Sequence, residues 1–520
     1  MHTPELCSGK RTRNDKREHP VQDQLFNEIL MARQRVYAAG QPTPLQQLTG
    51  LPVDAEIFLK REDLSTIHSY KWRGAYNRMA LLSPEERAKG VVCASAGNHA
   101  QGVALAAAAL ETHAQIFMPE STPNMKQESV ALHGGDHVDI VLTGDSYSDA
   151  AAAAQIYLKE SGRTYIHAYD DLATMGGQGT MADEIVMSGK GPFDVAYLQI
   201  GGGGMAASVA CWLKRYYPQV HIVGVEGVDQ CSMWAAIQAD HPVTLDYVDV
   251  FCDGTAVKRA GDLTFPLCRE LIDEFITVTN EEVAAAIEYL WKSRRCIPEP
   301  AGAMGIAGLL KQADQVRGKR CLTILCGANV DFDQLAWIAH HAGIGAARRK
   351  YYRLEMSEHP GGLRHLLDCI LEGINIIEVQ YGKTEEKHAW PVIGFEASPM
   401  TLDLLDKRLT EHKVPHEDVT SQADVEFRII NYEPHLFQRP YFITFEFPER
   451  AGALKDFLHS FENIANICYF NYTYSGEHVG RALIGFEFES DARKDEFMDL
   501  LASSNHTYRP LDEHVIERML

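Results

Sequence analysis

One lysine and three glycine-rich stretches carry most of the chemical signal in this chain of 520 residues. The lysine is Lys71, in the stretch Ser69-Tyr70-Lys71-Trp72-Arg73-Gly74-Ala75. The glycine-rich stretches are Ser95-Ala96-Gly97-Asn98-His99, Gly201-Gly202-Gly203-Gly204 and Cys326-Gly327-Ala328-Asn329. A lysine amine can form a Schiff base with a cofactor aldehyde, glycine loops can hold a phosphate, and a thiol can meet a ring nitrogen. Together these groups predict a site for pyridoxal phosphate with Lys71 as its catalytic residue.

Lys71 and the stretch from Ser95 indicate a functional site only when they are considered together. A lysine taken alone is most often a surface side chain, and a Ser/Asn stretch at a helix start can be a simple cap. Here the stretch follows a strand expected at 90–93 and opens a helix, whose free N–H groups suit a carboxylate. The residues expected to bind substrate are Ser95, Ala96, Gly97, Asn98 and His99. Asn98 can also donate to the ring oxygen of the cofactor, whereas His99 is given no part in the chemistry.

Four consecutive glycines between a strand and a helix predict a phosphate loop, because their backbone can curl and aim N–H groups at an anion. The expected cofactor ligands here are Gly201, Gly202, Gly203, Gly204 and Met205. The loop also fits the loose dinucleotide pattern Gly201-x-Gly203-x-x-Ala206, with Glu226 twenty residues further on. That alternative predicts a dehydrogenase that binds a nicotinamide cofactor, and it leaves Lys71 without a role.

Cys326 is the residue expected at the cofactor ring nitrogen. A free thiol has a pKa near 8.5, so unlike a carboxylate it would not keep that nitrogen protonated. A neutral ring is a poorer electron sink, which suits elimination, where a β-leaving group takes the electrons, over transamination. The structural alternative is that Cys326 is a small buried apolar residue, and both interpretations can hold at one position.

Composition narrows the possible partners and compartment. The net charge is −22, which argues against nucleic acid or an anionic membrane as partner. The eleven cysteines include no C-x-x-C pair, which indicates reduced thiols in a cytoplasmic protein and predicts no metal site. The N-terminus mixes acidic and basic residues without an apolar core, and no apolar run is long enough to span a bilayer.

The pattern of elements predicts where these groups lie. From about residue 50 to 330, short apolar runs alternate with amphipathic segments, which predicts mostly parallel sheets covered by helices. Strands are expected at 114–118, 138–142, 196–200, 222–225 and 322–325. Helices are expected at 71–82, 98–110, 149–160, 205–216 and 281–292. Ligands in such sheets bind at the carboxyl ends of strands, where the glycine-rich turns fall.

Beyond a charged junction at 346–350, the sequence contains an internal repeat with a constant offset of 91 residues. The stretch Ile393-Gly394-Phe395-Glu396 recurs as Ile484-Gly485-Phe486-Glu487, and Asn375-Ile376 recurs as Asn466-Ile467. Each copy is expected to begin with a strand, at 354–357 and 442–447, and to continue with a helix, at 363–371 and 454–461. Two copies are too few for a solenoid, so they predict two small α+β modules packed on each other.

These motifs, in this order, resemble those of the type II pyridoxal-phosphate lyases, and within them the biosynthetic threonine ammonia-lyase family. The likeness also rests on Gly177-Gln178-Gly179-Thr180, Asp253-Gly254-Thr255-Ala256-Val257-Lys258 and Glu299-Pro300-Ala301-Gly302-Ala303. It implies a tail at 1–25, a catalytic domain at 26–345, and ACT-like regulatory modules at 351–430 and 440–520. The fold class is then the α/β type II fold followed by two α+β modules.

The resemblance implies elimination of L-threonine to 2-oxobutanoate and ammonia in a cytoplasmic homotetramer. It implies an amino-acid effector, isoleucine first and valine second, bound near the loop before the first helix of each module. The candidate effector residues are Gly361, Leu363, Gly452 and Leu454. The alternatives are another type II reaction, such as L-serine dehydration or β-replacement, and an amino-acid sensor without catalysis. The repeat could also serve only in oligomerisation.

Two departures from the family pattern stand out. The family's His-Pro-Phe-Asp-Asp appears here as His167-Ala168-Tyr169-Asp170-Asp171. Related racemases carry a second serine as a base for the opposite face of the substrate, and this chain has Ala96 there. With Lys71 as the one apparent base, elimination is favoured over racemisation.

Overall fold

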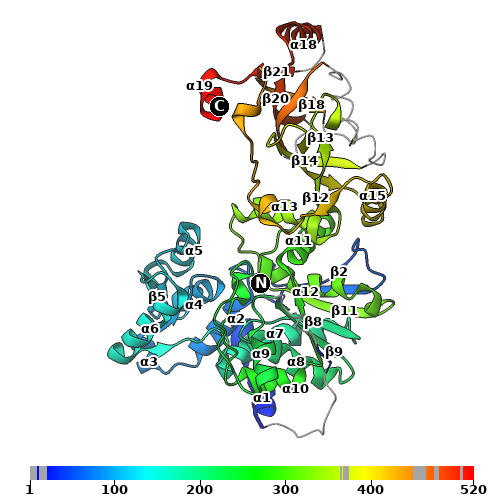
Figure 1. Ribbon diagram of the computed structural model, residues 1–520. Coiled ribbons are helices and arrows are strands. Elements are labelled where there is room, and N and C mark those ends of the chain that lie inside the picture. Colours follow the sequence, from blue (N-terminus) through cyan, green and yellow to red (C-terminus); the bar gives the residue numbers. More distant parts are fainter. Residues whose placement is uncertain are drawn as a thin grey trace. The chain divides into compact units, whose positions relative to one another are not determined.

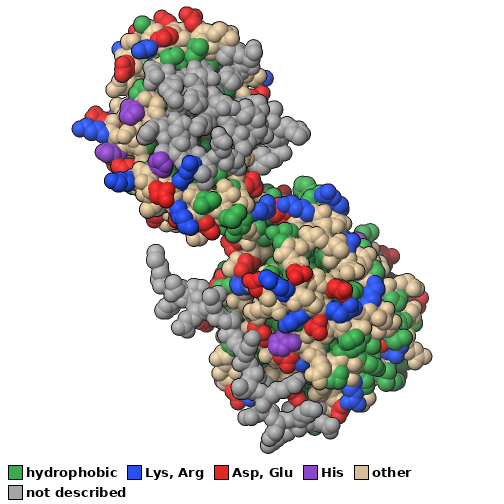
Figure 2. All heavy atoms as spheres, turned by 90° about the vertical axis from the view of Figure 1, so that its right-hand side faces the viewer, with side chains coloured by type: hydrophobic (Ala, Val, Ile, Leu, Met, Phe, Trp, Pro, Cys, Tyr) green, Lys and Arg blue, Asp and Glu red, His purple; other side chains and the backbone are tan. Residues whose placement is uncertain are grey.

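The structure is a computed structural model that describes residues 9–10, 20–363, 366, 374–448, 464–473, 479–503 and 507–520. The chain divides into two compact units, Met1–Gly345 and Ala346–Leu520 (Figure 1). No helix in the described part of the chain is both long and apolar enough to cross a membrane. On the face drawn in Figure 2, basic and acidic side chains are interspersed on both units.

The larger sheet of the first unit has seven strands in the order β1-β10-β9-β8-β11-β3-β2. In that order they are Gly9–Lys10, Glu274–Val278, His221–Gly227, Val195–Gln199, Arg320–Leu325, Glu56–Arg61 and Leu45–Leu48. The five strands from β10 to β3 are parallel, and the edge strands β1 and β2 are antiparallel to their neighbours. Every residue of β8 and β10 is buried, as expected for a parallel sheet covered on both faces.

The smaller sheet of the same unit has four parallel strands in the order β6-β5-β4-β7. They are Val138–Leu142, Ala114–Met118, Val91–Ala94 and Thr164–Tyr165. Strands β5 and β6 have the bounds predicted from the sequence, and β4 begins one residue later than predicted. Helices α4 (Asn98–Ala109), α5 (Asn124–Gly134) and α6 (Tyr147–Ser161) accompany this sheet.

Most other helices of the first unit surround the larger sheet, whereas α3 (Pro84–Lys89) lies beside the smaller one (Figure 1). Those used below are α1 (Pro20–Ala39), α2 (Lys71–Ala80), α7 (Leu172–Met187), α8 (Gly204–Tyr216), α9 (Ser232–Ala239), α11 (Asn280–Arg294), α12 (Pro300–Lys311) and α13 (Gln334–Gly345). Helix α1 starts within the segment expected to be a flexible tail at 1–25, and β1 lies there as well. The helix forms because Leu25, Ile29, Ala32 and Val36 recur at helical spacing and are fully buried.

The second unit is built on one eight-stranded antiparallel sheet in the order β17-β12-β16-β14-β19-β20-β18-β21. In that order the strands are His416–Asp418, Arg349–Leu354, Val392–Glu396, Asn375–Gly382, Asn466–Thr473, Val479–Glu487, Tyr441–Pro448 and Thr507–Pro510. The strand expected at 354–357 is split, because β12 ends at Leu354 and β13 (Met356–Ser357) pairs in a separate small sheet with β15 (His388–Ala389). Helices α15 (Pro399–Glu411) and α18 (Asp491–Ser503) occupy equivalent places in the two copies.

The repeat is visible in the register of this sheet. Strands β14 and β19 are related by the offset of 91 and pair with each other, with Gln380 opposite its counterpart Asn471. The pairing of each strand with its partner shifts at the same place, after Ile376 in one copy and after Ile467 in the other. The expected helix at 454–461 lies outside the described residues, and of the helix at 363–371 the structure describes residues 363 and 366.

Candidate active site

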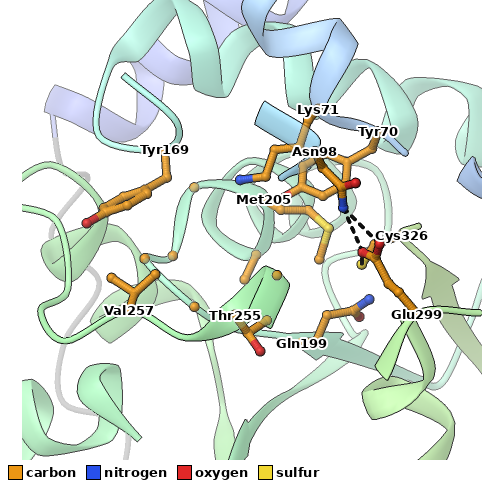
Figure 3. Close-up of a pocket in the computed structure, with 16 residues that line it drawn as sticks. Tyr70, Lys71, Asn98, Tyr169, Gln199, Met205, Thr255, Val257, Glu299 and Cys326 are labelled. Atoms are coloured by element: carbon orange, nitrogen blue, oxygen red, sulfur yellow. Dashed lines mark hydrogen bonds between the residues drawn. The ribbon is translucent and has the colours of Figure 1, made fainter. Parts of the chain in front are cut away.

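A single pocket gathers most of the residues that the sequence singles out (Figure 3). It holds about 490 Å³ of unfilled space, part of it open to solvent. Its lining consists of Tyr70, Lys71, Asn98, Tyr169, Gln199, Gly201, Gly202, Gly203, Gly204, Met205, Ala206, Gly254, Thr255, Val257, Glu299 and Cys326. Gln199 belongs to β8 of the larger sheet, and Asn98 opens α4, which follows β4 of the smaller sheet, so the pocket lies between the two sheets.

Parallel strands explain why distant segments meet here. The glycine loop follows β8, Cys326 follows β11, and the stretch from Ser95 follows β4, so each segment leaves the carboxyl end of a strand. Thr255 belongs to the short helical turn η3 (Asp253–Thr255), which crosses the pocket opposite Lys71.

Lys71 is the first residue of α2, and its amine points into the pocket (Figure 3). The Nζ atom donates to the backbone oxygen of Ala168 at 3.3 Å. Burial lowers the pKa of Lys71 to about 8, against the opposing influence of Cys326 and Glu299. A larger fraction of this amine is therefore neutral, and able to act as nucleophile or base, than of an exposed lysine at the same pH.

The glycine loop forms a cradle at the start of α8. Gly203 has φ +96°, a conformation that L side chains rarely adopt, and Gly204 begins the helix. The ring of Tyr169 lies where a Cβ atom on Gly202 would fall, and the hydroxyl of Thr264 donates to the Gly202 oxygen at 2.5 Å. The free N–H groups of this helix start suit an anion such as a phosphate.

Cys326 lies at the opposite end of the pocket and is 4% exposed. Burial raises the pKa of its thiol, and the carboxyl group of Glu299, with Oε1 4.0 Å from Sγ, raises it further. The group facing the pocket is therefore a neutral thiol. This state matches the weak partner of a ring nitrogen that the sequence predicts.

The predicted cofactor residues and the predicted substrate residues differ in how many of them line the pocket. Lys71, Asn98, the four glycines, Met205 and Cys326 all line the pocket. Of the residues expected to bind substrate, Asn98 lines it, whereas Ser95, Ala96, Gly97 and His99 are not among the lining residues described. Nε2 of His99 bonds the backbone oxygen of Ile166 at 2.8 Å, and burial lowers its pKa to about 3. This histidine is neutral and anchored to Ile166, the residue after β7, so it has no evident role in proton transfer.

Glu299 is the most important pocket residue that the sequence reasoning left without a role. It precedes Pro300, the first residue of α12, yet its side chain does not cap that helix. Its carboxyl group instead accepts from Asn98 Nδ2 at 2.8 and 2.9 Å and from the backbone N–H of Asn329 at 3.2 Å (Figure 3). A glutamate placed directly before a helix-initial proline was the available signal, because this residue type is an uncommon cap.

A second cluster of charges lies behind α2, away from the pocket. It contains Lys60, Glu62, Arg73 and Glu184, whose side chains are at most 6% exposed. Arg73 donates to both oxygens of Glu62, at 2.9 and 3.0 Å, and to both oxygens of Glu184, at 2.5 and 3.0 Å. Lys60 pairs with the same two carboxylates. We call these four residues the ion network.

The dinucleotide alternative does not fit the geometry. Glu226 is 1% exposed and accepts the backbone N–H groups of Met233 and Trp234 at 2.9 and 2.8 Å. Its carboxyl group therefore serves the start of α9 and is not open to a ribose. The glycine loop instead faces Lys71 and Cys326 across the pocket, an arrangement that fits pyridoxal phosphate.

Two of the four candidate effector residues can be described. Gly361 has φ +85°, and Leu363 is 6% exposed within the core of the second unit. Gly452 and Leu454 lie outside the described residues.

Comparison with known proteins gives the class. Residues 36–327 match the family described as Pyridoxal-phosphate dependent enzyme, and residues 436–518 match the C-terminal regulatory domain of Threonine dehydratase. The chain belongs to the pyridoxal-phosphate dependent enzymes of the type II fold, and its cofactor is pyridoxal phosphate.

Within that class, the chain belongs to the biosynthetic threonine dehydratases. It is 36% identical to the biosynthetic L-threonine dehydratase of Haemophilus influenzae, over 94% of this chain and 96% of that protein. It is 36% identical to the chloroplastic biosynthetic enzyme of Arabidopsis thaliana, over 91% of this chain and 80% of that one. The structure of processed threonine deaminase isoform 2 from Solanum lycopersicum aligns with a TM-score of 0.61 and 37% identity, over 66% of this chain and 93% of that one.

Proposed function

We propose that the protein eliminates water from L-threonine and releases 2-oxobutanoate and ammonia. The observation that carries this proposal is the pocket itself, in which a lysine amine of lowered pKa, a glycine loop and a neutral thiol face one another. When bound, pyridoxal phosphate withdraws electrons from the substrate's Cα. This chain's residues hold the cofactor and the substrate and move the Cα proton. When that proton returns from the Lys71 amine to the β-hydroxyl, the hydroxyl leaves as water, and hydrolysis of the resulting imine gives 2-oxobutanoate and ammonia.

The residues divide the work as follows. The loop from Gly201 to Gly204 holds the phosphate, and Asn98 donates an N–H to the ring oxygen. The Lys71 amine removes the proton from Cα, and its fixed place at the start of α2 supplies much of the rate through proximity. The turn from Ser95 to His99, which opens α4, holds the substrate carboxylate, with the backbone N–H groups of the helix start as donors.

The neutral thiol of Cys326 favours elimination over transamination. It carries no negative charge that would hold a proton on the ring nitrogen, because burial keeps the thiol protonated. Dehydration of L-serine uses the same groups and is the alternative substrate class. The discriminating measurement is the ratio of kcat/KM for threonine and serine.

The second unit is proposed to bind an amino-acid effector, with isoleucine the first candidate and valine the second. A buried polar cluster joins its two copies and supports this proposal. Lys383 pairs with Glu487 at 2.5 Å, and Asn466 donates to Glu487 at 2.8 Å and to Glu358 at 2.7 Å. Tyr381 donates to Glu358 at 2.5 Å. With two carboxyl groups and one ammonium, the cluster suits a ligand ammonium, and Glu358 lies three residues before Gly361.

The proposed assembly is a cytoplasmic homotetramer, as the resemblance to the family implies. Size-exclusion chromatography with light scattering measures the oligomer directly. A monomer at working concentration would contradict it.

Release of 2-oxo acid from L-threonine, with and without L-isoleucine, tests the function. We expect release by the protein loaded with pyridoxal phosphate, and suppression of that release by isoleucine. Release that isoleucine and valine leave unchanged would contradict the regulatory proposal and keep the catalytic one. No release from threonine would overturn the catalytic proposal, and release from serine alone would move it to serine dehydration.

A further inference from the structure

The amide of Asn98 is held at both ends by groups that fix which way it points. Its oxygen accepts from Asn329 Nδ2 at 2.6 Å, and its nitrogen donates to both oxygens of Glu299, at 2.8 and 2.9 Å. Asn329 is itself anchored, because the same Nδ2 donates to the backbone oxygen of Ile67 at 2.9 Å. The orientation of the Asn98 amide therefore depends on an acceptor on one side and a donor on the other.

A carboxylate is what makes this orientation unique. An ionised carboxyl group accepts hydrogen bonds and cannot donate them, so turning the Asn98 amide over would set its oxygen against Glu299 and its nitrogen against the nitrogen of Asn329. The two oxygens of Glu299 can share one N–H of Asn98, which leaves the second N–H of that nitrogen for a ligand. Both residues line the pocket on the side of Cys326 (Figure 3).

We propose that Glu299 is a positioning residue for the cofactor, which fixes the Asn98 amide with one N–H directed at the ring oxygen of pyridoxal phosphate. The glycine at position 327 is consistent with this role of Glu299. The carboxyl group lies against Gly327, where any Cβ atom would collide with it, so a glycine next to Cys326 lets Glu299 approach. The proposal concerns cofactor binding and rests on the cofactor site, not on the choice of substrate.

Burial and the charges around Glu299 determine the pH range in which its carboxyl group is ionised and can fix the Asn98 amide. Burial first and Asp253 second raise its pKa, while the bonds from Asn98 and Asn329 together with Lys126 oppose the shift, and the resulting pKa is about 7. Lys126 pairs with Asp253 at 2.5 Å, and Lys71 and Cys326 face Glu299 from the pocket. Because the folded pKa is raised, Glu299 binds a proton as pH falls through about 7. In that state it can donate to Asn98, and the amide loses its unique orientation.

The test measures cofactor affinity in variants that cannot bind it covalently. In Lys71→Ala protein, the dissociation constant of pyridoxal phosphate is measured by fluorescence between pH 5.5 and 8.5, with and without Glu299→Gln. A glutamine can present either an acceptor or a donor, so we expect it to weaken binding about tenfold at pH 8, as for loss of one charge-assisted hydrogen bond. The ratio of the two constants should fall toward one below pH 6. Taking the ratio removes the cofactor's own titration.

Glu226→Gln is the matched control. Glu226 is also a buried carboxyl whose pKa is raised by burial, to about 8, but its bonds go to α9 and it does not line the pocket. It should leave the affinity unchanged at every pH. An equal loss in Glu226→Gln, or a ratio that stays constant with pH, would overturn the positioning role. If the Lys71→Ala parent binds no cofactor, the site proposal fails with it, whereas equal binding with and without Glu299→Gln removes only the role of Glu299.

Discussion

Two clusters of buried charge meet at the first turn of α2, and they differ in how their charges are balanced. The ion network behind the helix has two cations and two carboxylates, with each carboxylate bonded to both cations. The pocket has Lys71 and Glu299, whose side chains are not paired with each other in the described part of the chain. Arg73 and Lys71 lie two residues apart on one helix, yet Arg73 belongs to a charge-balanced cluster and Lys71 to an unbalanced one.

The balance of charge decides which groups keep their ordinary ionisation. Burial opposes ionisation of Glu62, but Arg73 and Lys60 outweigh it and lower the pKa to about 2. In the pocket, burial outweighs the opposing influence of nearby groups, so the pKa of Lys71 falls to about 8 and that of Glu299 rises to about 7. The paired charges of the ion network stabilise the fold. The pocket groups lack such pairing, and their pKa values lie close to neutral pH, where proton transfer is efficient.

The largest effect is expected from a substitution that removes Lys71 from the pocket. Lys71→Ala removes both the amine that would link the cofactor and the base that takes the Cα proton, so turnover of threonine should fall below detection. The visible absorption band of the linked cofactor should disappear as well. Arg78→Met removes a different cation of the same helix and is the control, because Arg78 pairs with Asp171 at 3.2 Å and does not line the pocket. Normal turnover in Lys71→Ala would contradict the assignment.

The next effect breaks the ion network and should appear in stability. Arg73→Met leaves Glu62 and Glu184 with Lys60 as their one remaining cation in the network, and removing one partner of a buried pair costs about 3–5 kcal/mol. The free energy of unfolding from a denaturant titration of the apoprotein measures this loss. Arg78→Met, whose partly exposed pair with Asp171 has side chains 22% and 27% exposed, should cost less than about 1 kcal/mol. Equal losses in the two variants would erase the distinction between the clusters.

Much of the fold and of the pocket followed from the sequence, because both depend on patterns that are local. Strands β5 and β6 and the offset of 91 residues were predicted as the structure has them. A shared site for the glycine loop and Cys326 could be predicted because both follow parallel strands, whose carboxyl ends are where ligands bind in such sheets. Lys71 and Asn98 were assigned to the same site from their motifs, and the packing of the second sheet places Asn98 there. Helix α1 was not predicted, because the mixed charges at residues 10–18 are typical of a solvated tail and the apolar positions of the helix begin only after them.

The role of Glu299 and the ion network could not be predicted in the same way. The bond from Asn98 to Glu299 joins residues 201 positions apart, and that from Arg73 to Glu184 joins residues 111 apart. No periodicity in a single chain states which buried acid will meet which base. A charged residue in an apolar segment indicates that a partner exists, but only the packing of the elements identifies that partner.

The smallest expected effect is a pH dependence that separates the uncompensated Lys71 from the compensated Arg73. Only the neutral amine of Lys71 attacks the cofactor aldehyde, so the rate of covalent capture by the apoprotein should rise about tenfold per pH unit below pH 8 and level off above it. The same cofactor reacting with a simple amine corrects for the cofactor's own titration. Glu299→Gln should move the inflection to lower pH, because the charge of Glu299 raises the pKa of Lys71. An inflection near the ordinary value of about 10.4 would mean that the amine is solvated like a surface lysine, and the contrast with the compensated Arg73 would no longer explain why Lys71 is reactive.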